Sequence, residues 1–344
     1  MNLLGKMDSK KIKKIVNIID KREPVVILTH SNPDGDAVGS SIALGLALRK
    51  SNIPVNIIIP DAIPVFLEWL PGNDLITIHK DNQSAVTGML SEAKIIFCLD
   101  FNDPDRINAV GEMVKQSAAL KVLIDHHRDP SDFADITYSE PWRGSAGEMI
   151  YLFIKKVFGN DILDKDIATA LYVAIMTDTG NFRYGCSYPE IFHIAGELMQ
   201  FPIDKDEIYA KVYENFSADR MRLMGYCLHH KMVVLPEYNT AYIALSSAEL
   251  RRFNYRKGDT EGFVNIPLSI DGIRFTALFI EKRNIIKVSF RSKGNFPANE
   301  FAEKHFNGGG HLNAAGGELK DSMKECIEKF VNLLPEYEEA LGKA

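Results

Sequence analysis

Short runs of Val, Ile and Leu alternate with helical patterns through the first half of the chain. The apolar runs lie at 25–29, 55–59, 95–99 and 122–124. Runs of this length without polar alternation are typical of strands that are buried on both faces of a parallel sheet. Helical patterns at 37–49 and 107–116 lie between them. This alternation predicts an α/β domain with a mostly parallel sheet and helices on both faces.

The pattern changes after about Asp219. Four segments then resemble half-exposed strands: "NTAYIALS", "GFVNIPLSI", "IRFTALFIEK" and "NIIKVSFRSK". The sequences "DGIR" and "EKRNII" predict hairpin turns between them. Helices are expected at 146–176, 189–200, 297–305 and 323–341. Because the chain is long enough for two domains, we expect a first domain at 1–200, a linker at 201–228 and a smaller α+β domain at 229–344.

Composition limits the class of protein. The net charge of −6 argues against non-specific coating of DNA, so no long duplex nucleic acid is expected as a partner. The four cysteines lack CxxC spacing, which argues against a disulfide framework or a zinc site and fits a reducing cytosol. The first residues form an amphipathic pattern rather than a signal peptide, and the longest apolar-rich stretch, 167–176, is too short to span a bilayer. We therefore expect a cytoplasmic protein without a membrane partner.

Histidine and aspartate residues directly follow three of the apolar runs. In an open parallel sheet such groups gather outside the carboxyl ends of the strands. Two further aspartates lie in the loop after the first run, and one lies just past an apolar helix. We expect one cluster of these side chains: His30, Asp34, Asp36, Asp100, His126, His127 and Asp178.

The cluster would bring several carboxylates into one pocket. They would repel one another by roughly 4 kcal/mol for each close pair at an effective dielectric constant near 20. Such a cluster either takes up protons or binds cations. Imidazole and carboxylate ligands without thiolates favour manganese, magnesium or iron over structural zinc. Two such ions about 4 Å apart are suited to displacement at phosphorus.

Each aspartate also has a simpler interpretation when it is taken alone. Asp34 is then a residue that closes a turn before Gly35. Asp36 is then the cap of the helix that begins near Ala37. The convergence of several strand ends on one edge of the sheet favours the cluster over these separate roles.

Several stretches of the chain resemble the motifs of the DHH phosphoesterases. They are "THSNPDGDAVGS", the isolated Asp100, "IDHHRD" and "MTDTG". A later stretch, "FRSKGNFPANEFAEKHFNGGGHLNAAGGEL", resembles the signature of the DHHA1 domain. The resemblance covers nearly the whole chain, in the order found in the family. Length and two-domain plan are similar to those of the nanoRNase/pAp phosphatase group, whose members degrade very short oligoribonucleotides and dephosphorylate 3′-phosphoadenosine 5′-phosphate.

The resemblance implies a site for two Mn²⁺ ions, with Mg²⁺ as an alternative. It divides the ligands into two sets that share one carboxylate. His30 and Asp34 would hold the first ion, Asp36, His126 and Asp178 the second, and Asp100 would bridge both.

The resemblance also assigns roles in the reaction. Asp125 would orient a histidine through one of its ring nitrogens. His127 would lie beside the scissile phosphate, where it stabilises developing charge or protonates the leaving oxygen. A water that bridges the two ions, and is made more acidic by both, would be the nucleophile.

In the second domain, the resemblance assigns substrate binding to Arg291, Gly309, Gly310, His311 and Asn313. A glycine backbone can approach a phosphate closely, and arginine suits bidentate phosphate contacts. Taken alone, a glycine cluster is more often a flexible turn, and a lone arginine is more often a surface charge. The expected site lies in a cleft between the two domains and prefers short single-stranded RNA or nucleotides such as pApA.

Other functions are compatible with this first domain. An exopolyphosphatase and a RecJ-like single-strand exonuclease are the alternatives within the family, and a nucleotide-binding regulatory protein is the non-enzyme alternative. Arg106 either reaches the site or pairs with Asp103 or Asp105. The basic stretch 251–257 is either a solvated loop or a base-stacking surface. The sequence leaves the oligomeric state open, with a homodimer among the options.

Overall fold

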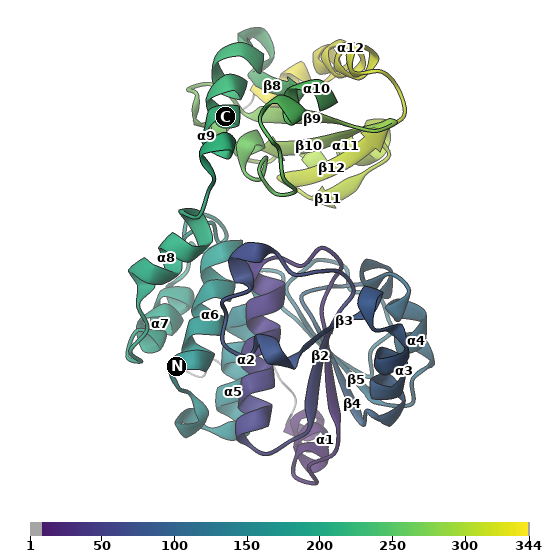
Figure 1. The fold of residues 1–344 in the computed structure, drawn as a ribbon, viewed down its shortest axis with the longest axis vertical. Coiled ribbons are helices and arrows are strands. Elements are labelled where there is room, and N and C mark those ends of the chain that lie inside the picture. The colour runs from purple at the N-terminus through teal and green to yellow at the C-terminus, as the bar shows by residue number, and fades with distance from the viewer. Residues whose placement is uncertain (1–8, 343–344) are drawn as a thin grey trace. The chain divides into compact units, whose positions relative to one another are not determined.

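The structure is a computed structural model that describes residues 9–342. The chain forms two compact units, which divide between Asn215 and Phe216 (Figure 1). Helices α8 (Lys205–Tyr213) and α9 (Ala218–Tyr226) occupy the segment that the sequence predicts as a linker, and the division falls between them. Within 9–342, no helix has the length and apolar character needed to cross a membrane.

The first unit contains a six-stranded sheet in which every neighbouring pair of strands is parallel. The order of the strands is β3-β2-β1-β4-β5-β6. They are β1 (Val25–Leu28), β2 (Val55–Ile59), β3 (Ile76–Ile78), β4 (Ile95–Leu99), β5 (Leu120–Asp125) and β6 (Ile136–Ser139). The predicted parallel-sheet α/β domain is therefore confirmed.

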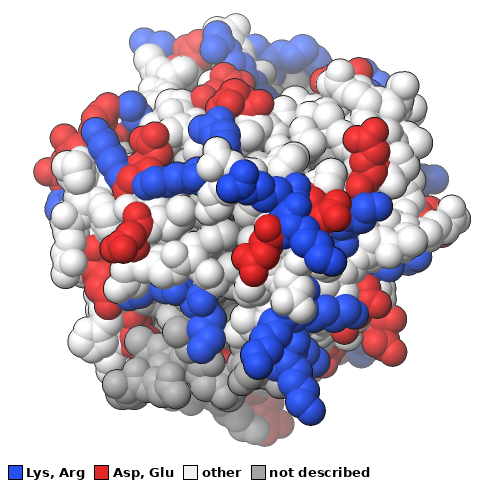
Figure 2. Space-filling model, turned by 90° about the horizontal axis from the view of Figure 1, so that it is seen from below, with Lys and Arg blue, Asp and Glu red and all other residues white. Residues whose placement is uncertain are grey.

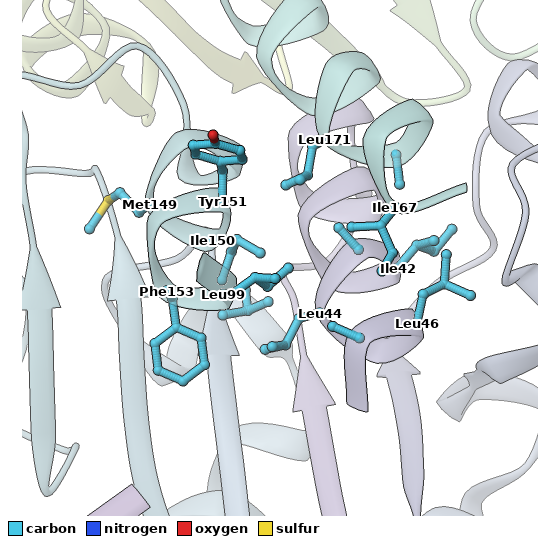
Figure 3. Packing of buried hydrophobic residues seen from close by; sticks show 14 of the residues in the cluster. Ile42, Leu44, Leu46, Leu99, Met149, Ile150, Tyr151, Phe153, Ile167 and Leu171 are labelled. Atoms are coloured by element: carbon cyan, nitrogen blue, oxygen red, sulfur yellow. The ribbon is translucent and has the colours of Figure 1, made fainter. Parts of the chain in front are cut away.

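Helices cover both faces of this sheet (Figure 1). One face carries α2 (Gly35–Lys50), α5 (Ala146–Phe158) and α6 (Lys165–Asp178), and the other carries α3 (Gln83–Glu92) and α4 (Val110–Gln116). The unit also contains α1 (Ser9–Ile19) and α7 (Pro189–Leu198). Strand residues alternate between the two cores: Val25 and Ile27 join one, and Val26 and Leu28 join the other. Figure 3 shows side chains of α2, α5 and α6 packed in the first core.

Glycines allow α2 to lie very close to α6. A Cβ atom on Gly39 would lie 2.6 Å from the carbonyl oxygen of Ala170. At the beginning of α2, a Cβ on Gly35 would lie 2.3 Å from Oγ1 of Thr177, next to the end of α6. Only glycine leaves room for these contacts. They hold the beginning of α2 beside the end of α6, and both ends carry aspartates of the predicted cluster.

Two predicted helices are interrupted in the structure. The stretch 146–176 is divided after α5 by Gly159, which has a φ of 79° that favours glycine. The stretch 323–341 is divided into α12 (Met323–Leu333) and α13 (Glu338–Gly342) by a 3₁₀ turn, Leu334–Tyr337, which contains Pro335. Glycine and proline are common at such ends because neither continues a helix well.

The second unit contains a mixed six-stranded sheet with the order β11-β12-β10-β9-β8-β7. β8 and β9 are parallel, and the other neighbouring pairs are antiparallel. The strands are β7 (Met232–Leu235), β8 (Thr240–Leu245), β9 (Phe275–Lys282), β10 (Ile285–Ser292), β11 (Gly309–His311) and β12 (Ala314–Leu319). Besides α9, the helices are α10 (Ser247–Arg252), α11 (Ala298–Phe306), α12 (Met323–Leu333) and α13 (Glu338–Gly342). The predicted α+β character is confirmed.

One predicted strand of this unit is wrong. The segment "GFVNIPLSI" forms a 3₁₀ helix, Phe263–Ser269, with Pro267 inside it. Proline cannot donate to a strand ladder, so this residue was a signal against the strand. The turn predicted at "DGIR" therefore joins no hairpin. The turn at "EKRNII" does connect β9 to β10, where Lys282 pairs with Ile285.

Candidate metal centre

The cluster predicted from the sequence gathers at the carboxyl edge of the first sheet. β1, β4 and β5 each lead into one or two of its residues, α2 begins beside two more, and α6 ends with the last. Their ligand atoms lie within 4.8 Å of one another in three groups. The groups are His30–Asp34–Asp100, Asp36–His126–Asp178 and Asp100–His126–His127. The structure thus brings all seven residues together.

Asp100 lies between two histidines. Its Oδ2 atom is 3.5 Å from Nε2 of His30, and its Oδ1 atom is 3.4 Å from Nε2 of His126. The residue is buried, and within the described part of the chain its Oδ1 accepts no hydrogen bond. Burying a carboxylate oxygen without a hydrogen-bond donor costs free energy unless a cation or an ordered water molecule contacts it. Asp100 therefore has an oxygen that a cation could meet, and it belongs to two of the three groups.

Both histidines are held from behind by backbone carbonyl groups. Nδ1 of His30 lies 2.9 Å from the oxygen of Ser31, and Nδ1 of His126 lies 3.1 Å from the oxygen of Arg143. Because a carbonyl oxygen only accepts, each Nδ1 carries the proton in these bonds. The Nε2 atoms then face the carboxylates, and Nε2 of His126 lies 3.3 Å from Oδ2 of Asp178. This is the arrangement in which an imidazole can bind a metal ion.

Asp125 orients His127 rather than His126. Its Oδ1 atom lies 2.7 Å from Nδ1 of His127, and its Oδ2 atom accepts from the backbone N–H of the same residue at 3.1 Å. The carboxylate therefore fixes both the tautomer and the direction of this ring. His127 is itself largely buried, and its Nδ1 lies 3.7 Å from Oδ1 of Asp100.

The two aspartates of the first loop have different partners. Asp34 caps α2, since its Oδ1 accepts from the N–H groups of Asp36 and Ala37, each at 3.0 Å. The alternative in which Asp36 caps this helix is therefore wrong. The buried carboxylate of Asp36 instead accepts from the N–H groups of Ala146 and Gly147, at 2.6 and 2.9 Å, in the first turn of α5. Capping and cation binding are compatible for Asp34, because a carboxylate has several acceptor sites.

The pKa values of the cluster reflect its concentrated negative charge. Burial opposes a charge on His30, but the hydrogen bond and charge of Asp100 outweigh it and raise the pKa to about 9. Burial, followed by the charges of Asp100 and Asp178, raises the pKa of Asp36 well above its usual value. Burial also raises the pKa of Asp178 to about 7, although the charge of His126 acts in the opposite direction. A cation bound here would compete with protons for these side chains.

An ion-pair network lies behind the cluster and was not predicted from the sequence. Nε of Arg143 donates to Oε2 of Glu140 at 2.5 Å, and its Nη1 lies 3.4 Å from Oε2 of Glu148. The other oxygen of Glu148 accepts from the N–H of Gly144 at 2.9 Å and from the hydroxyl of Tyr188 at 2.5 Å. All three charged side chains are buried. Their only sequence signal is one arginine between two glutamates in "EPWRGSAGE".

The residues of the cluster fit divalent cations. The three groups offer imidazole nitrogens and carboxylate oxygens, and the described cysteines lie elsewhere in the buried cores. Donor sets of this kind suit Mn²⁺, Mg²⁺ or Fe²⁺. The oxygen of Asp100 without a hydrogen-bond donor supplies a structural reason for a cation at this place.

The residues predicted for substrate binding lie in the second unit. Arg291 is half-buried on β10, on the sheet face opposite Phe290, and its Nη1 donates to the oxygen of Phe290 at 2.9 Å. Asn313 donates to Oγ of Ser292 and to the oxygen of Gly294, each at 2.9 Å, so its amide group supports the turn before β12.

The glycine cluster forms an edge strand rather than a loop. Gly309 pairs with Gly316 of β12, and Gly310 pairs with Ala315. A Cβ on Gly310 would lie 2.5 Å from the oxygen of Ala314, whereas one on Gly309 would meet no atom within 4 Å. The backbone of His311 completes β11, and its side chain lies outside the described part of the structure.

Two basic features of the sequence, Arg106 and the stretch 251–257, have a few contacts in the structure. The carbonyl oxygen of Arg106 accepts from the N–H of Ser31 at 2.8 Å, beside the cluster, and Asp105 lies 3.6 Å from Nζ of Lys115. In the second unit, the guanidinium of Arg252 lies 5.7 Å from the centre of the Phe253 ring. The two interpretations of Arg106, and the two of the basic stretch 251–257, therefore stay predictions.

A cavity of about 420 Å³ lies at the opposite edge of the first sheet, before β1, β4 and β5. Its lining includes four lysines, Glu23 and Asp135. Nζ of Lys121 donates to the oxygen of Ser117 at 2.9 Å. The space-filling view shows basic and acidic side chains interspersed on the face that it draws (Figure 2). This cavity holds none of the clustered residues.

Comparison with known proteins places these observations in a family. The N-terminal domain of the DHH family matches residues 24–175, and the DHHA1 domain matches residues 238–340. A bifunctional oligoribonuclease and PAP phosphatase, NrnA, of Bacillus subtilis is 27% identical over 328 residues, which cover 94% of this chain and 99% of the relative. The NrnA of Thermus thermophilus is 28% identical over 322 residues, covering 91% of this chain and 90% of that protein.

Solved structures agree with the fold. An exopolyphosphatase-related protein of Bacteroides fragilis is 42% identical, covers 96% of this chain and 97% of its own, and has a TM-score of 0.94. The Mn²⁺ complex of RecJ from Thermus thermophilus covers 96% of this chain and 55% of its own, at 13% identity and a TM-score of 0.58, and shows a likeness of fold alone. With both domains matched and a relative of 42% identity along almost its full length, the chain belongs to the DHH family of phosphoesterases and carries a DHHA1 domain.

Proposed function

We propose that this chain is a divalent-cation-dependent phosphohydrolase. It would cleave short oligoribonucleotides to mononucleotides and remove phosphate from 3′-phosphoadenosine 5′-phosphate. The observation that carries the proposal is the position of Asp100 between two groups of imidazole and carboxylate ligands. The substrate class follows the curated relatives, which are named as oligoribonucleases and PAP phosphatases.

The proposed centre holds two Mn²⁺ ions, with Mg²⁺ as the alternative. His30 and Asp34 would bind one ion, Asp36, His126 and Asp178 the other, and Asp100 both. When bound, such ions neutralise the carboxylates, make a water more acidic for attack and stabilise charge on the phosphoryl oxygens.

His127 is the proposed acid of the reaction. Since Nδ1 of this ring is held by Asp125, the nitrogen that would face a substrate is Nε2. Protonated there, His127 would donate its proton to the leaving oxygen. His127→Ala should therefore retain cation binding and lose turnover, whereas loss of cation binding in this variant would contradict the assignment.

The second unit would bind the phosphate-bearing end of the substrate. Arg291, Gly309, Gly310, His311 and Asn313 remain the proposed residues. β11 supports this proposal because Gly309 leaves open space beside an edge-strand backbone, where N–H groups can meet a phosphate. Asn313 would act through the turn that its amide holds.

Hydrolysis assays test the function directly. The protein with Mn²⁺ is incubated with pApA, with 3′-phosphoadenosine 5′-phosphate or with polyphosphate, beside an Asp100→Ala control. We expect the wild type to release product from the two nucleotides and the control to release none. Equal nucleotide binding without turnover by both proteins would favour the regulatory alternative and overturn the proposal.

Exopolyphosphatase activity is the second candidate. It is favoured by the 42% identical protein of Bacteroides fragilis, which is named as exopolyphosphatase-related. A preference for polyphosphate over pApA in the same assay would replace the oligoribonuclease proposal by this one.

A further inference from the structure

The segment 140–148, which joins β6 to α5, supports two of the proposed ligands from behind. The oxygen of Arg143 accepts from Nδ1 of His126 at 3.1 Å. The N–H groups of Ala146 and Gly147 donate to the two oxygens of Asp36 at 2.6 and 2.9 Å. This segment therefore fixes the direction of one imidazole and of one carboxylate.

Both supported ligands belong to the same group of the centre. His126 and Asp36 share the group that Asp178 completes. Among the described contacts, none joins 140–148 to His30 or Asp34, the ligands found only in the other group. The N-terminus of α5 also favours negative charge on Asp36, because the helix dipole is positive there. The segment 140–148 thus orients ligands of one proposed cation position and not of both. We call it the backing of that position.

Buried ion pairs hold this backing in place. The guanidinium of Arg143 lies between Glu140 and Glu148, and Glu148 also accepts from Tyr188 and from the backbone of Gly144. Removing one partner of a buried charge pair leaves the other uncompensated, which displaces or destabilises the chain around it. The carbonyl of Arg143 and the N–H groups that meet Asp36 lie within four residues of one another in this chain.

We propose that Glu148, through Arg143 and Tyr188, is a positioning residue that sets the cation affinity of the Asp36–His126–Asp178 group alone. The inference rests on the proposed function, because it requires that the centre bind two cations. Partners behind a ligand typically change metal affinity by about 10–100-fold when they are removed. The change should therefore fall on one of two binding steps.

The chain offers a matched control for Glu148. Glu197 of α7 accepts from the hydroxyl of Tyr151 and, at 2.5 Å, from Nζ of Lys155, so it too is a glutamate held by a tyrosine and a cation against α5. Among the described contacts, none joins it to a proposed ligand. Glu197→Gln removes a more exposed ion pair from the same helix and does not touch the segment 140–148.

The test is a calorimetric titration of the full chain with Mn²⁺ alone. We expect two binding steps for the wild type and for Glu197→Gln. For Glu148→Gln we expect one unchanged step and one that is weaker by about 10–100-fold. Tyr188→Phe, which removes a single hydroxyl, should weaken the same step and keeps the test open if Glu148→Gln does not fold. Excess Mn²⁺ should restore phosphohydrolase activity to the variants, which general damage to the fold would prevent.

The outcomes separate this inference from the proposed function. A wild type that binds no Mn²⁺ would overturn the proposed function and the inference with it. A wild type with two steps, together with variants whose steps are both unchanged or both weakened equally, would overturn the inference alone. Selective weakening in Glu148→Gln or Tyr188→Phe, but not in Glu197→Gln, supports it.

Discussion

The backbone of Asp100 adopts a φ of 61°, in the left-handed region. A residue with a Cβ atom occupies this region at a cost of order 1–3 kcal/mol, which is retained mainly at functional sites. Here it occurs directly after β4, at a buried carboxylate whose oxygens face His30 and His126. Strain, burial and shared contacts therefore coincide at the residue to which the bridging role is assigned.

Gly309 offers a test of substrate binding that leaves the fold intact. A methyl group there meets no atom within 4 Å, whereas on Gly308 it would lie 1.8 Å from the oxygen of Gly316. If the backbone of β11 binds a phosphate, Gly309→Ala should raise KM for pApA by about tenfold or more, as expected for loss of a hydrogen bond to a charged group. The unfolding midpoint should stay at the wild-type value, and Gly308→Ala should lower it. An unchanged KM in Gly309→Ala would contradict the role of this strand.

Glu249 should make the stability of the second unit depend on pH. Burial opposes its charge, but hydrogen bonds from Ser246, Tyr226 and Lys231 outweigh burial and lower its pKa to about 2, from an ordinary value of 4.5. The unfolded chain thus binds this proton at a higher pH than the folded chain. The stabilisation is complete above pH 4.5 and is lost as the pH falls towards 2.

Glu249→Gln should therefore lower the free energy of unfolding at pH 7 by about 1–2 kcal/mol, a typical value for a helix cap. Urea titrations followed by circular dichroism at several pH values would measure this difference. The gap between variant and wild type should narrow below pH 4.5, and a gap of constant size down to pH 3 would speak against the low pKa.

The sequence predicted the clustered side chains but not the residues behind them. His30, Asp100 and His126 follow buried strands, and the topology of a parallel sheet brings such positions to one edge. Arg143 and Glu148 could not be recognised in this way, because charged side chains are usually exposed and nothing in their spacing marks them as buried. Their role depends on which backbone groups they hold, and only the structure shows this.

The packing of α2 against α6 controls the spacing of the centre. Since a Cβ on Gly39 would lie 2.6 Å from the oxygen of Ala170, Gly39→Ala should force these helices apart and cost about 1–3 kcal/mol of stability. Cation affinity should fall as well, because α2 carries Asp36 and α6 carries Asp178. Gly88→Ala in α3 is the control: its Cβ meets open space, so it should stabilise the protein by about 0.5–1 kcal/mol. Equal thermal midpoints and Mn²⁺ affinities for the two variants would disprove this account of the packing.

Elements buried on both faces were easier to predict than edge elements. β1 and β4 are continuous apolar runs in the middle of the sheet, and their prediction is confirmed. β3 and β6 escaped prediction because they are short strands at the two edges with partly exposed residues. The 3₁₀ helix Phe263–Ser269 was mistaken for a strand because its apolar residues are those that also favour strands. Local composition does not distinguish a strand from a 3₁₀ helix in such segments. The elements against which each segment packs decide its structure.

The two units separate the proposed chemistry into a cation-binding part and a phosphate-binding part. All proposed cation ligands lie in the unit that ends at Asn215, and the DHHA1 match lies wholly in the other. Both tryptophans of the chain, Trp69 and Trp142, also belong to the first unit. Tryptophan fluorescence therefore reports unfolding of the cation-binding unit, whereas circular dichroism reports the helices and strands of both.

Removal of cations should consequently affect one unit more than the other. A ligand that binds only the folded state stabilises it by about 2.7 kcal/mol at one hundred times its dissociation constant. Bound Mn²⁺ would also relieve the repulsion among Asp36, Asp100 and Asp178, which otherwise opposes folding of the first unit. Addition of EDTA to the Mn²⁺-loaded protein should thus lower the thermal midpoint seen by tryptophan fluorescence. Asp100→Ala should show no such shift, and a wild type whose fluorescence midpoint is the same with Mn²⁺ and with EDTA would contradict cation binding at this centre.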